Sequence, residues 1–369
     1  MSYESRKRFA VLGAGHGGQA MACHLAIMGF DVALFNRGHH RIEPIKMRGG
    51  IELTGEVTGF GVPRVVTTDP AEAIEEADVV MVVVPASAHQ WMAQTFAPHF
   101  KDGQVILLNP GRTGGAMEFR KVLRDARCKA QVIVGEAQTF IYASRSMGPA
   151  QSRIFRIKNT VPVAALPASD TPALLAAINE AYPQFVPAPS VLNTSLDNMG
   201  AVFHPTITLL NTGWIEARAG EFEFYFEGVT TSVAKVLEEV DAERVAVARA
   251  LGVRAVTALE WLEMAYAAVG ETLYDAMHNN EGYEGIKAPP TIRNRYLFED
   301  IPASLVPIAS IGNMVGVPTP TISALVQIGC LVHQTDYWKE GRTVEKLGLA
   351  GMSIDEIREF VFHGRAEMG

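Results

Sequence analysis

The sequence predicts an α/β domain built on a doubly wound parallel sheet, followed by an all-α C-terminal domain. Short apolar runs rich in β-branched residues alternate with helical stretches through the first half of the chain. A proline-rich stretch spans residues 183–192, and from residue 193 onward the hydrophobic spacing is helical. A chain of 369 residues usually divides into two cores, so we expect an α/β domain over residues 1–190 and a helical domain over residues 191–369.

The N-terminal residues predict a strand, a glycine-rich turn, a helix and a second strand. Residues 8–12 (RFAVL) form a short apolar run, and residues 13–18 read Gly-Ala-Gly-His-Gly-Gly, a G-x-G-x-x-G motif. An alanine- and methionine-rich helical stretch ends at Gly29, and residues 31–35 (DVALF) have the pattern of the next strand. This is the context in which the motif binds a dinucleotide, so the sequence predicts a Rossmann domain.

The residues of this loop have separate expected roles. Gly13 permits the tight turn, Gly15 lets the backbone approach a pyrophosphate, and Gly18 lets the helix pack closely on the strand. The free N–H groups and the dipole at the helix N-terminus favour phosphate. We therefore expect cofactor binding along the whole loop, including His16 and Gly17. A glycine-rich turn without a ligand is the alternative that the motif alone leaves open.

The end of the second predicted strand bears on the choice of nicotinamide cofactor. NAD-binding domains usually carry an Asp or Glu there, which binds the ribose 2′-hydroxyl. This chain has Asn36 and Arg37 instead, and an arginine can bind the 2′-phosphate of NADP and stack on the adenine. We expect NADP(H) to be favoured and NAD(H) to be possible; the alternative is that Arg37 is only an exposed loop residue.

The remaining elements of the N-terminal half follow from their apolar patterns. Continuous apolar runs predict buried parallel strands over residues 79–84 (VVMVVV), 104–108 (QVILL) and 131–134 (QVIV). The alternating, glycine-containing residues 52–66 predict a hairpin insertion, and residues 69–77 predict a short acidic helix.

Ligands of open α/β sheets bind at the carboxyl ends of the strands. The loops that follow the three predicted buried strands span residues 85–89, 109–115 and 136–145. We expect these loops to line the nicotinamide and substrate site, with Pro85 and Asn109 at the cofactor and Glu136 as a candidate substrate ligand. The alternatives are that Asn109 only caps a turn and that Glu136 is solvated.

A histidine stands out in the C-terminal half. Residues 198–213 (NMGAVFHPTITLLNTG) predict an apolar helix on which His204 and Asn211 lie two turns apart on one face. Their apolar neighbours are expected to shield His204 from water, and Pro205 would free backbone groups beside it and could aim it at a cleft. Taken alone, a histidine on an apolar face is more often a core residue than a catalyst.

Two further polar segments lie in the same half. Residues 287–302 (KAPPTIRNRYLFEDIP) hold Arg293, Arg295, Glu299 and Asp300 between prolines, and residues 225–231 (YFEGVTT) mix aromatic, acidic and hydroxyl groups. Taken alone, the first segment has the composition of a charged surface loop.

Composition excludes several classes of function. The formal net charge of −8 disfavours nucleic acid, and no apolar window is long enough to suggest a membrane span. The three cysteines, Cys23, Cys128 and Cys330, are far apart, which fits a reducing compartment and predicts neither a disulfide framework nor a metal site. We expect a cytoplasmic protein that binds small molecules, and a homodimer is possible because two-fold homodimers are the commonest oligomers.

Taken together, the motifs resemble the octopine/nopaline (opine) dehydrogenase family over nearly the whole chain. The residues that carry the resemblance are Gly13 to Gly18, the N-x(5)-H-P-x(5)-N pattern from Asn198 through His204 and Pro205 to Asn211, Tyr225 to Gly228 (YFEG), Arg295 to Pro302 (RYLFEDIP) and Gly316 to Pro320 (GVPTP).

The resemblance implies a nicotinamide-dependent oxidoreductase that acts on CH–NH donors. Such an enzyme condenses the amino group of an amino acid reductively with an α-keto acid, pyruvate in many members, or oxidises the resulting opine. The resemblance further implies that His204 is the catalytic histidine, Asp300 its carboxylate partner and Arg295 the arginine that pairs with the keto-acid carboxylate. These roles suit the residue types, because imidazole transfers protons near neutral pH, a carboxylate fixes its tautomer and arginine binds carboxylates bidentately.

The amino-donor pocket stays open at this point. Candidate substrate residues are Glu136, Tyr142, Arg145, Asn198, Asn211, Tyr225 and Glu227.

Two other functions compete with an opine dehydrogenase. One is reduction of a keto acid without an amine, as in ketopantoate reductase or glycerol-3-phosphate dehydrogenase, which rely on a catalytic lysine; Lys235 and Lys287 are the lysines to consider here. The other is a non-catalytic nicotinamide-binding regulator, which would bind cofactor without turnover.

Overall fold

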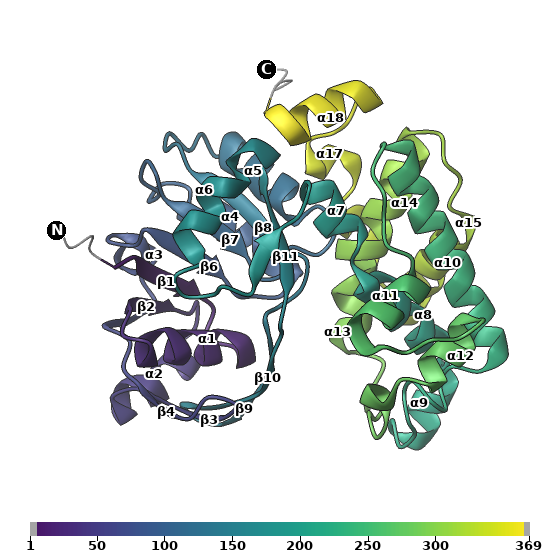
Figure 1. Ribbon diagram of the computed structural model, residues 1–369, viewed down its shortest axis with the longest axis horizontal. Coiled ribbons are helices and arrows are strands. Elements are labelled where there is room, and N and C mark those ends of the chain that lie inside the picture. Colours follow the sequence, from purple (N-terminus) through teal and green to yellow (C-terminus); the bar gives the residue numbers. More distant parts are fainter. Residues whose placement is uncertain (1–5, 365–369) are drawn as a thin grey trace. The chain divides into compact units, whose positions relative to one another are not determined.

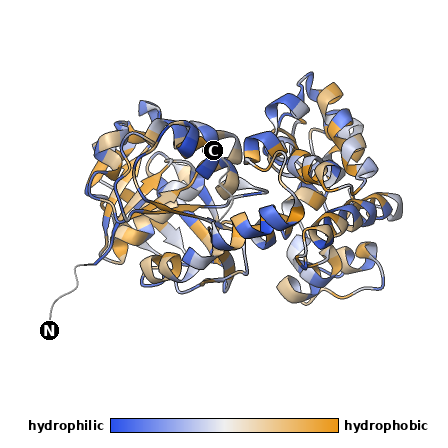
Figure 2. Cartoon of the chain, turned by 90° about the horizontal axis from the view of Figure 1, so that it is seen from above, coloured by the Kyte–Doolittle hydropathy of each residue, from blue (hydrophilic) through white to orange (hydrophobic). Residues whose placement is uncertain are grey.

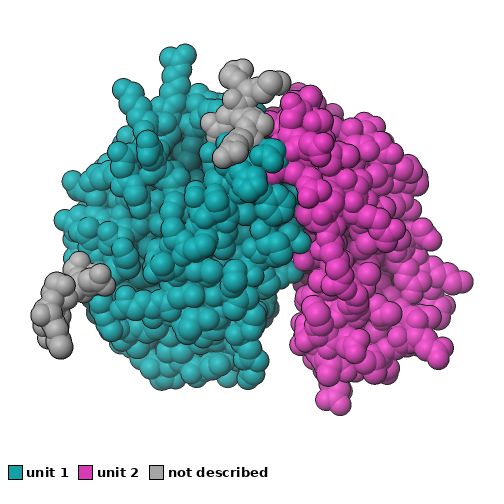
Figure 3. Space-filling view, turned by 45° about the horizontal axis from the view of Figure 1, so that its top comes forward, with its two compact units in different colours: residues 1–111, 115–194, 359–369 teal, residues 112–114, 195–358 magenta. Residues whose placement is uncertain are grey.

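The computed structural model of the chain describes residues 6–364, which form two compact units (Figure 3). Of the described residues, unit 1 comprises 6–111, 115–194 and 359–364, and unit 2 comprises 112–114 and 195–358. A segment of three residues that follows a strand of unit 1 therefore belongs to unit 2. No helix among residues 6–364 is long and apolar enough to cross a membrane.

Unit 1 is organised around an eight-stranded sheet of order β12-β11-β8-β7-β6-β1-β2-β5 (Figure 1). Its strands are β1 (Arg8–Leu12), β2 (Asp31–Phe35), β5 (Val65–Thr67), β6 (Val79–Val82), β7 (Val105–Leu108), β8 (Ile133–Ala137), β11 (Val161–Leu166) and β12 (Phe185–Pro187). The strands from β5 to β8 are parallel neighbours, and β11 runs antiparallel to β8. Within these parallel strands the spatial order is 3-2-1-4-5-6, the order of a Rossmann fold, so the predicted doubly wound sheet is confirmed.

Helices cover both faces of this sheet because successive strand residues point to opposite sides. Phe9 and Val11 of β1 belong to the apolar cluster that includes residues of α1 and α6, whereas Phe35 of β2 packs edge-on against Phe96 of α4 at a centroid distance of 5.0 Å. Hydrophobic residues, orange in Figure 2, mark the strands of this unit. The helices are α1 (His16–Ile27), α2 (His39–Arg48), α3 (Pro70–Ile74), α4 (His89–Phe96), α5 (Gly115–Asp125) and α6 (Thr171–Ile178).

A second, four-stranded sheet of order β4-β3-β10-β9 packs against α1. Its strands are β3 (Ile51–Gly55), β4 (Gly59–Gly61), β9 (Tyr142–Gly148) and β10 (Gln151–Ile157). Residues 52–66 contain the predicted hairpin, because β3 and β4 are antiparallel, although β5 already belongs to the main sheet. The expectation of a loop over residues 136–145 is wrong, since this range holds the end of β8 and the start of β9.

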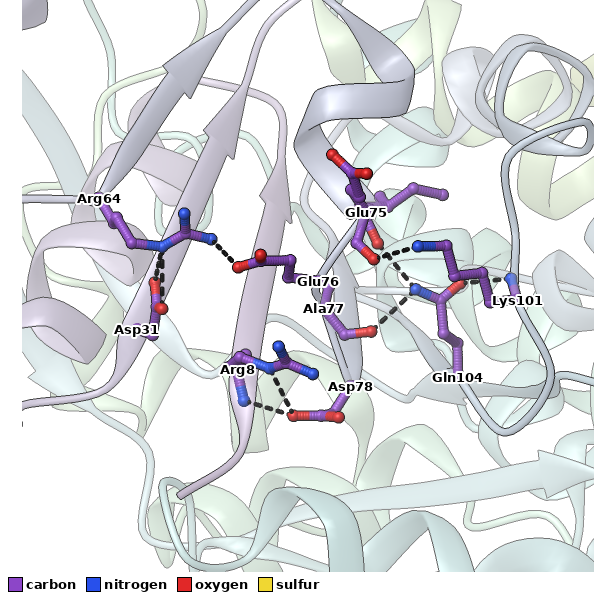
Figure 4. A network of polar contacts seen from close by, with 10 residues as sticks. Arg8, Asp31, Arg64, Glu75, Glu76, Ala77, Asp78, Lys101 and Gln104 are labelled. Atoms are coloured by element: carbon purple, nitrogen blue, oxygen red, sulfur yellow. Dashed lines mark hydrogen bonds and ion pairs between the residues drawn. The ribbon is translucent and has the colours of Figure 1, made fainter. Parts of the chain in front are cut away.

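A polar network occupies the amino ends of the strands (Figure 4). Asp78, before β6, accepts a hydrogen bond of 2.8 Å from the backbone N–H of Arg8, and Arg64 donates to Asp31 at the start of β2 over 2.7 Å. Gln104, before β7, donates to two backbone carbonyls at the end of and after α3. Ligands bind at the opposite, carboxyl edge of such a sheet, so we assign this network to stability. Its exposed ion pairs are worth about 0–1 kcal/mol each.

Unit 2 is helical, and the isolated bridge between Glu223 and Lys287 is its only strand-type pairing among the described residues. The predicted all-α second domain is confirmed. Its elements follow α7 (Val191–Leu196): α8 (Met199–Leu210), α9 (Thr212–Arg218), α10 (Thr231–Ala250), α11 (Ala258–Tyr266), α12 (Leu273–His278), η3 (Glu281–Tyr283), α13 (Arg295–Phe298), the π-helical η4 (Ile301–Leu305), α14 (Val306–Met314), α15 (Pro320–His333), α16 (Tyr337–Glu340), α17 (Val344–Leu347) and α18 (Ile354–His363).

A buried arginine ties several of these helices together. Arg244 of α10 is fully buried and pairs with Asp241, 2.5 Å away on the same helix. Its guanidinium also donates to the backbone carbonyls of Leu196, at the end of α7, and Val256, before α11. A charge buried this deeply needs such partners, so Arg244 fixes the chain segments on either side of α8.

Candidate functional site

The glycine-rich turn of unit 1 has the geometry that the motif predicts. Gly13 has a φ of +112°, and a Cβ at this position would lie 2.5 Å from the carbonyl oxygen of Val83, so only glycine fits beside the end of β6. A Cβ at Gly18 would lie 1.6 Å from the carbonyl oxygen of Gly13. A Cβ at Gly15 would meet no protein atom within 4 Å, which leaves room for a ligand to approach the backbone there.

The surroundings of the turn fit a dinucleotide. The first turn of α1 carries no acidic residue, and no side chain caps its N-terminus, so its N–H groups and dipole favour phosphate. His16 is exposed, and its Nδ1 accepts a hydrogen bond of 2.8 Å from the backbone N–H of Ser146 on β9. A Cβ at Gly17 would lie 2.7 Å from the ring of Phe140, so this glycine serves packing.

The end of β2 has no carboxylate for a ribose. Asn36 accepts a hydrogen bond from the backbone N–H of Ala14 over 3.1 Å and donates to the carbonyl of Gly38, so it supports the glycine-rich turn. Arg37 is exposed, and its guanidinium carbon lies 5.4 Å from the ring centre of Trp91 in α4. This cation–π contact holds an arginine where the adenosine end of a dinucleotide binds in Rossmann domains.

The carboxyl ends of β6 and β7 add two of the predicted residues. Pro85 is exposed after β6, whereas Asn109 after β7 is buried. The Asn109 amide donates to the carbonyl of Leu107 over 2.9 Å, and its Oδ1 is buried without a hydrogen-bond partner among residues 6–364. An unpartnered buried acceptor is costly, and an N–H donor of a bound cofactor is the kind of group that would satisfy it.

Glu136 and Tyr142 do not face a ligand. The Glu136 side chain is fully buried in unit 1 and accepts hydrogen bonds from the N–H of Ala116 over 2.7 Å and the hydroxyl of Thr194 over 2.6 Å. The Tyr142 hydroxyl bonds to Nδ1 of His24 and the hydroxyl of Tyr182. Both expected substrate ligands are therefore corrected to internal packing residues. Arg145 is exposed on β9.

In unit 2 the predicted histidine and aspartate are joined directly. His204 lies in the middle of α8, which continues through Pro205, and Asp300 lies between α13 and η4. The two meet at 2.8 Å through His204 Nδ1 and Asp300 Oδ2. The Asp300 side chain is fully buried, and 17% of the His204 side chain is exposed. The carboxylate therefore fixes the tautomer, which leaves Nε2 without a partner among the described residues.

Arg112 completes this pair, although the sequence analysis did not single it out. Its Nη1 lies 3.3 Å from Asp300 Oδ1, and its Nε donates to Glu299 Oε1 over 3.3 Å. Burial alone would raise the pKa of Asp300, but the Arg112 guanidinium and the His204 imidazole hold it below its ordinary value. Asp300 is therefore an ionised carboxylate at neutral pH.

An aromatic wall borders the histidine. The ring of Tyr296 stacks on that of His204 at a centroid distance of 4.1 Å and an angle of 19°. Arg295 is exposed, with its guanidinium carbon 6.0 Å from the Tyr296 ring centre, and none of the described residues forms an ion pair with it. The cation is thus beside the histidine and free to bind an anion.

Tyr225 also lies close to this group. Its ring packs against Phe224, which in turn lies 5.3 Å from Tyr296, and its other side stacks on Tyr283 at 3.9 Å. Burial raises the pKa of Tyr225, with smaller contributions from neighbouring tyrosines and Asp300. Its hydroxyl is therefore neutral and has no hydrogen-bond partner among residues 6–364, so it can donate to a ligand.

The other candidate substrate residues of unit 2 have local roles. The Asn198 amide donates to the Ser304 hydroxyl over 2.9 Å. The Asn211 amide donates to the carbonyls of Ile207 and Gly228. Glu227 is exposed and accepts a bond from the backbone N–H of Glu223. Their expected contact with substrate is corrected, because these atoms already hold the helix ends and turns together.

Sequence reasoning missed Arg112, Glu299 as its partner, and the stacking role of Tyr296. Arg112 was hidden in the glycine-flanked run Gly111 to Gly115, which the analysis assigned to a loop at the end of β7. Its signal was an arginine among glycines at a strand end. No spacing rule connects it to residues almost two hundred positions away. Among residues 6–364, no cluster of three or more His, Cys, Asp or Glu could hold a metal ion.

Comparisons with known proteins match both halves of the chain. The family model described as NAD/NADP octopine/nopaline dehydrogenase, alpha-helical domain, matches residues 187–333. The one described as NAD binding domain of 6-phosphogluconate dehydrogenase matches residues 8–111. An opine dehydrogenase of Arthrobacter sp. (strain 1C) is 41% identical over 356 residues, which cover 96% of this chain and 99% of the relative.

Solved structures agree on the fold. Octopine dehydrogenase with NADH and L-arginine superposes with a TM-score of 0.80 at 22% identity, over 95% of this chain and 97% of the other. Yersinopine dehydrogenase with bound NADP⁺ does so with a TM-score of 0.75 at 15% identity, over 96% and 98%.

Proposed function

Because the chain belongs to the opine dehydrogenase family, we propose that it uses His204 to catalyse the NAD(P)H-dependent reductive condensation of an α-keto acid with an amino acid, and the reverse oxidation. The observation that carries the assignment of His204 is its 2.8 Å bond to the buried carboxylate of Asp300. A histidine oriented in this way can transfer a proton through its other nitrogen. This is the chemistry that a dehydrogenase must add to hydride transfer.

The bound nicotinamide supplies or accepts the hydride. In the condensing direction, the amine and the keto acid lose water to form a C=N bond. As the hydride reaches its carbon, His204 Nε2–H gives its proton to the nitrogen, and the product is a secondary amine. In the opposite direction, Nε2 takes that proton as the hydride leaves. Asp300 stabilises the imidazolium in both directions through Nδ1.

Arg295 and Tyr225 are the proposed substrate contacts beside this histidine. Arg295 offers a planar set of donors for the keto-acid carboxylate, and its place next to Tyr296 supports this role. The neutral Tyr225 hydroxyl supplies a hydrogen-bond donor. A carboxylate held by an arginine fixes one end of the substrate, so the carbonyl carbon can be presented to hydride and histidine together.

We assign NADP(H) as the preferred cofactor. The end of β2 lacks a carboxylate, because Asn36 is committed to the glycine-rich turn. Arg37, which lies over Trp91, carries a positive charge at this end and would pair with a 2′-phosphate. NAD(H) is the weaker expected ligand.

A reductase that depends on lysine is less well supported. Lys235 and Lys287 are both exposed, and neither forms a hydrogen bond or an ion pair with His204, Asp300 or Arg112. The oxidoreductase chemistry of the family also disfavours a regulator that binds cofactor without turnover.

The test is His204→Ala in the full-length enzyme, compared with the wild type. The variant should bind NADPH with unchanged affinity, followed by cofactor fluorescence, and its kcat should fall by about 10²–10⁴-fold. A kcat close to that of the wild type would remove His204 from the mechanism. Loss of cofactor affinity together with kcat would point to a damaged fold instead.

A further inference from the structure

The carboxylate of Asp300 is held from two sides by groups of opposite function. Its Oδ2 bonds to His204 Nδ1 at 2.8 Å, and its Oδ1 lies 3.3 Å from Arg112 Nη1. We propose that Arg112 is a positioning residue for the reaction, which keeps Asp300 oriented toward His204. This inference rests on the acid–base role proposed above for His204.

Nothing else among residues 6–364 fixes the second oxygen of Asp300. Asp300 Oδ1 is fully buried and has no hydrogen bond, so the ion pair with Arg112 is its one polar contact there. The neighbouring Glu299 is also buried and shares the same guanidinium. Two adjacent buried carboxylates would favour protonation of one of them without a cation. Arg112 therefore keeps Asp300 an acceptor for the Nδ1 proton of His204.

The backbone at Arg112 is committed to this arrangement. Its φ is +60°, a left-handed conformation that non-glycine residues adopt rarely and that concentrates at functional sites. Bonds within unit 2 hold the two residues that follow. The N–H of Thr113 donates to the Ala303 carbonyl over 3.1 Å, and the N–H of Gly114 donates to the Ser195 hydroxyl over 2.9 Å.

Packing against α8 limits where the guanidinium can go. A Cβ placed on Gly200 would lie 2.8 Å from Arg112 Nη1 and 3.4 Å from His204 Nδ1. The arginine, the aspartate and the histidine thus share the space opened by a residue without a side chain, one turn before His204. Only 11% of the Arg112 side chain is exposed, and both nitrogens that have printed partners face carboxylates, which distinguishes it from the exposed Arg295.

The experiment compares Arg112→Ala and Arg112→Lys with wild type, with Thr113→Val as the matched control. Thr113→Val removes a hydroxyl that bonds to the Ser195 carbonyl in the same segment and leaves the Asp300 ion pair untouched. Each variant is assayed for kcat and KM as a function of pH, with and without added guanidinium chloride at low millimolar concentration. Cofactor binding and melting temperature confirm that each variant folds.

Arg112→Ala should lower kcat by about 10–100-fold, as expected when a group that orients a catalytic residue is removed, with KM for the keto acid changed far less. The acid limb of its kcat/KM profile should move to higher pH, because Asp300 protonates more readily without the cation. Added guanidinium should restore part of kcat, and Arg112→Lys should lie between alanine and wild type. Thr113→Val should keep the wild-type pH profile.

Other outcomes would overturn the proposal. An unchanged kcat and pH profile in Arg112→Ala would show that Asp300 needs no help. A loss without any pH shift or guanidinium rescue, matched by Thr113→Val, would make Arg112 a structural residue. A rise in the keto-acid KM alone would make it a substrate ligand. Should Arg112→Ala not fold, the pH profile of Arg112→Lys decides. His204→Ala, assayed in parallel, separates failure of this proposal from failure of the histidine assignment.

Discussion

Replacing Asp300 by asparagine should disable catalysis while leaving the shape of the site almost unchanged. The side chain is fully buried and bonds to His204 Nδ1 at 2.8 Å. An amide of the same size can present its N–H₂ to that nitrogen, which reverses the tautomer and removes the charge that stabilises the imidazolium. Loss of a buried aspartate of this kind from a histidine pair lowers kcat by about 10⁴-fold in the serine-protease example of the same geometry. We expect a loss of about 10³–10⁴-fold here.

The same variant should change stability in a direction that depends on pH. Asparagine leaves Arg112 with only Glu299 as a carboxylate partner, so we expect a cost of about 1–3 kcal/mol at neutral pH. The pKa of Asp300 lies below its ordinary value of 3.8 in the folded protein. Its stabilising contribution is therefore present above that ordinary value and is lost as the pH falls through the folded pKa. The difference between wild type and Asp300→Asn should shrink in that acid range.

Two measurements check this prediction. Steady-state oxidation of NADPH gives kcat, and urea unfolding at a series of pH values gives the free energy of unfolding. A kcat within about tenfold of wild type would refute the proposed tautomer control by Asp300. A stability difference that grows as the solution becomes more acidic would refute the assignment of an ionised Asp300.

Three other substitutions have defined outcomes. Arg37→Ala should weaken NADPH binding by about 10–100-fold, because a charge-assisted contact is worth about 1.5–3 kcal/mol, and should change NADH binding little; an unaltered ratio in titrations would contradict the assigned preference. Arg295→Ala should raise the KM for the keto acid by about 10–100-fold and that for the amino acid far less, whereas equal effects would indicate a structural arginine. Arg244→Ala should lower the free energy of unfolding by about 3–5 kcal/mol, since it leaves buried Asp241 without its cation; a loss below about 1 kcal/mol in urea unfolding would show that water replaces the guanidinium.

The sequence predicted the parts of the fold that local patterns encode. The strand over residues 8–12, the glycine-rich turn and the strand over residues 31–35 are confirmed, because turn glycines and apolar runs act over a few residues. The second sheet was only partly foreseen. Strands β9 and β10 carry exposed polar residues on alternate positions, such as Arg145 and Arg153, and their hydrophobic contacts come from α1, which no local pattern reveals.

The candidate site divides in the same way. His204, Asp300 and Arg295 were selected with the help of the family resemblance, and the structure brings the first two together. Glu136 was misassigned because a carboxylate after a strand reads as solvated or ligand-facing, whereas its partners Ala116 and Thr194 come from distant segments. Long-range pairing of this kind is set by tertiary packing and is not visible in the spacing of residues along the chain.

The most direct test of the central claim is the dependence of NADPH and NADH oxidation on an amine. The full-length enzyme is assayed with pyruvate alone and with pyruvate plus each standard amino acid, and positive reactions are repeated with His204→Ala. The account predicts turnover that requires both substrates, is faster with NADPH, and is lost in the variant. Turnover with pyruvate alone, at the rate observed with amino acids present, would contradict it and make the protein a keto-acid reductase.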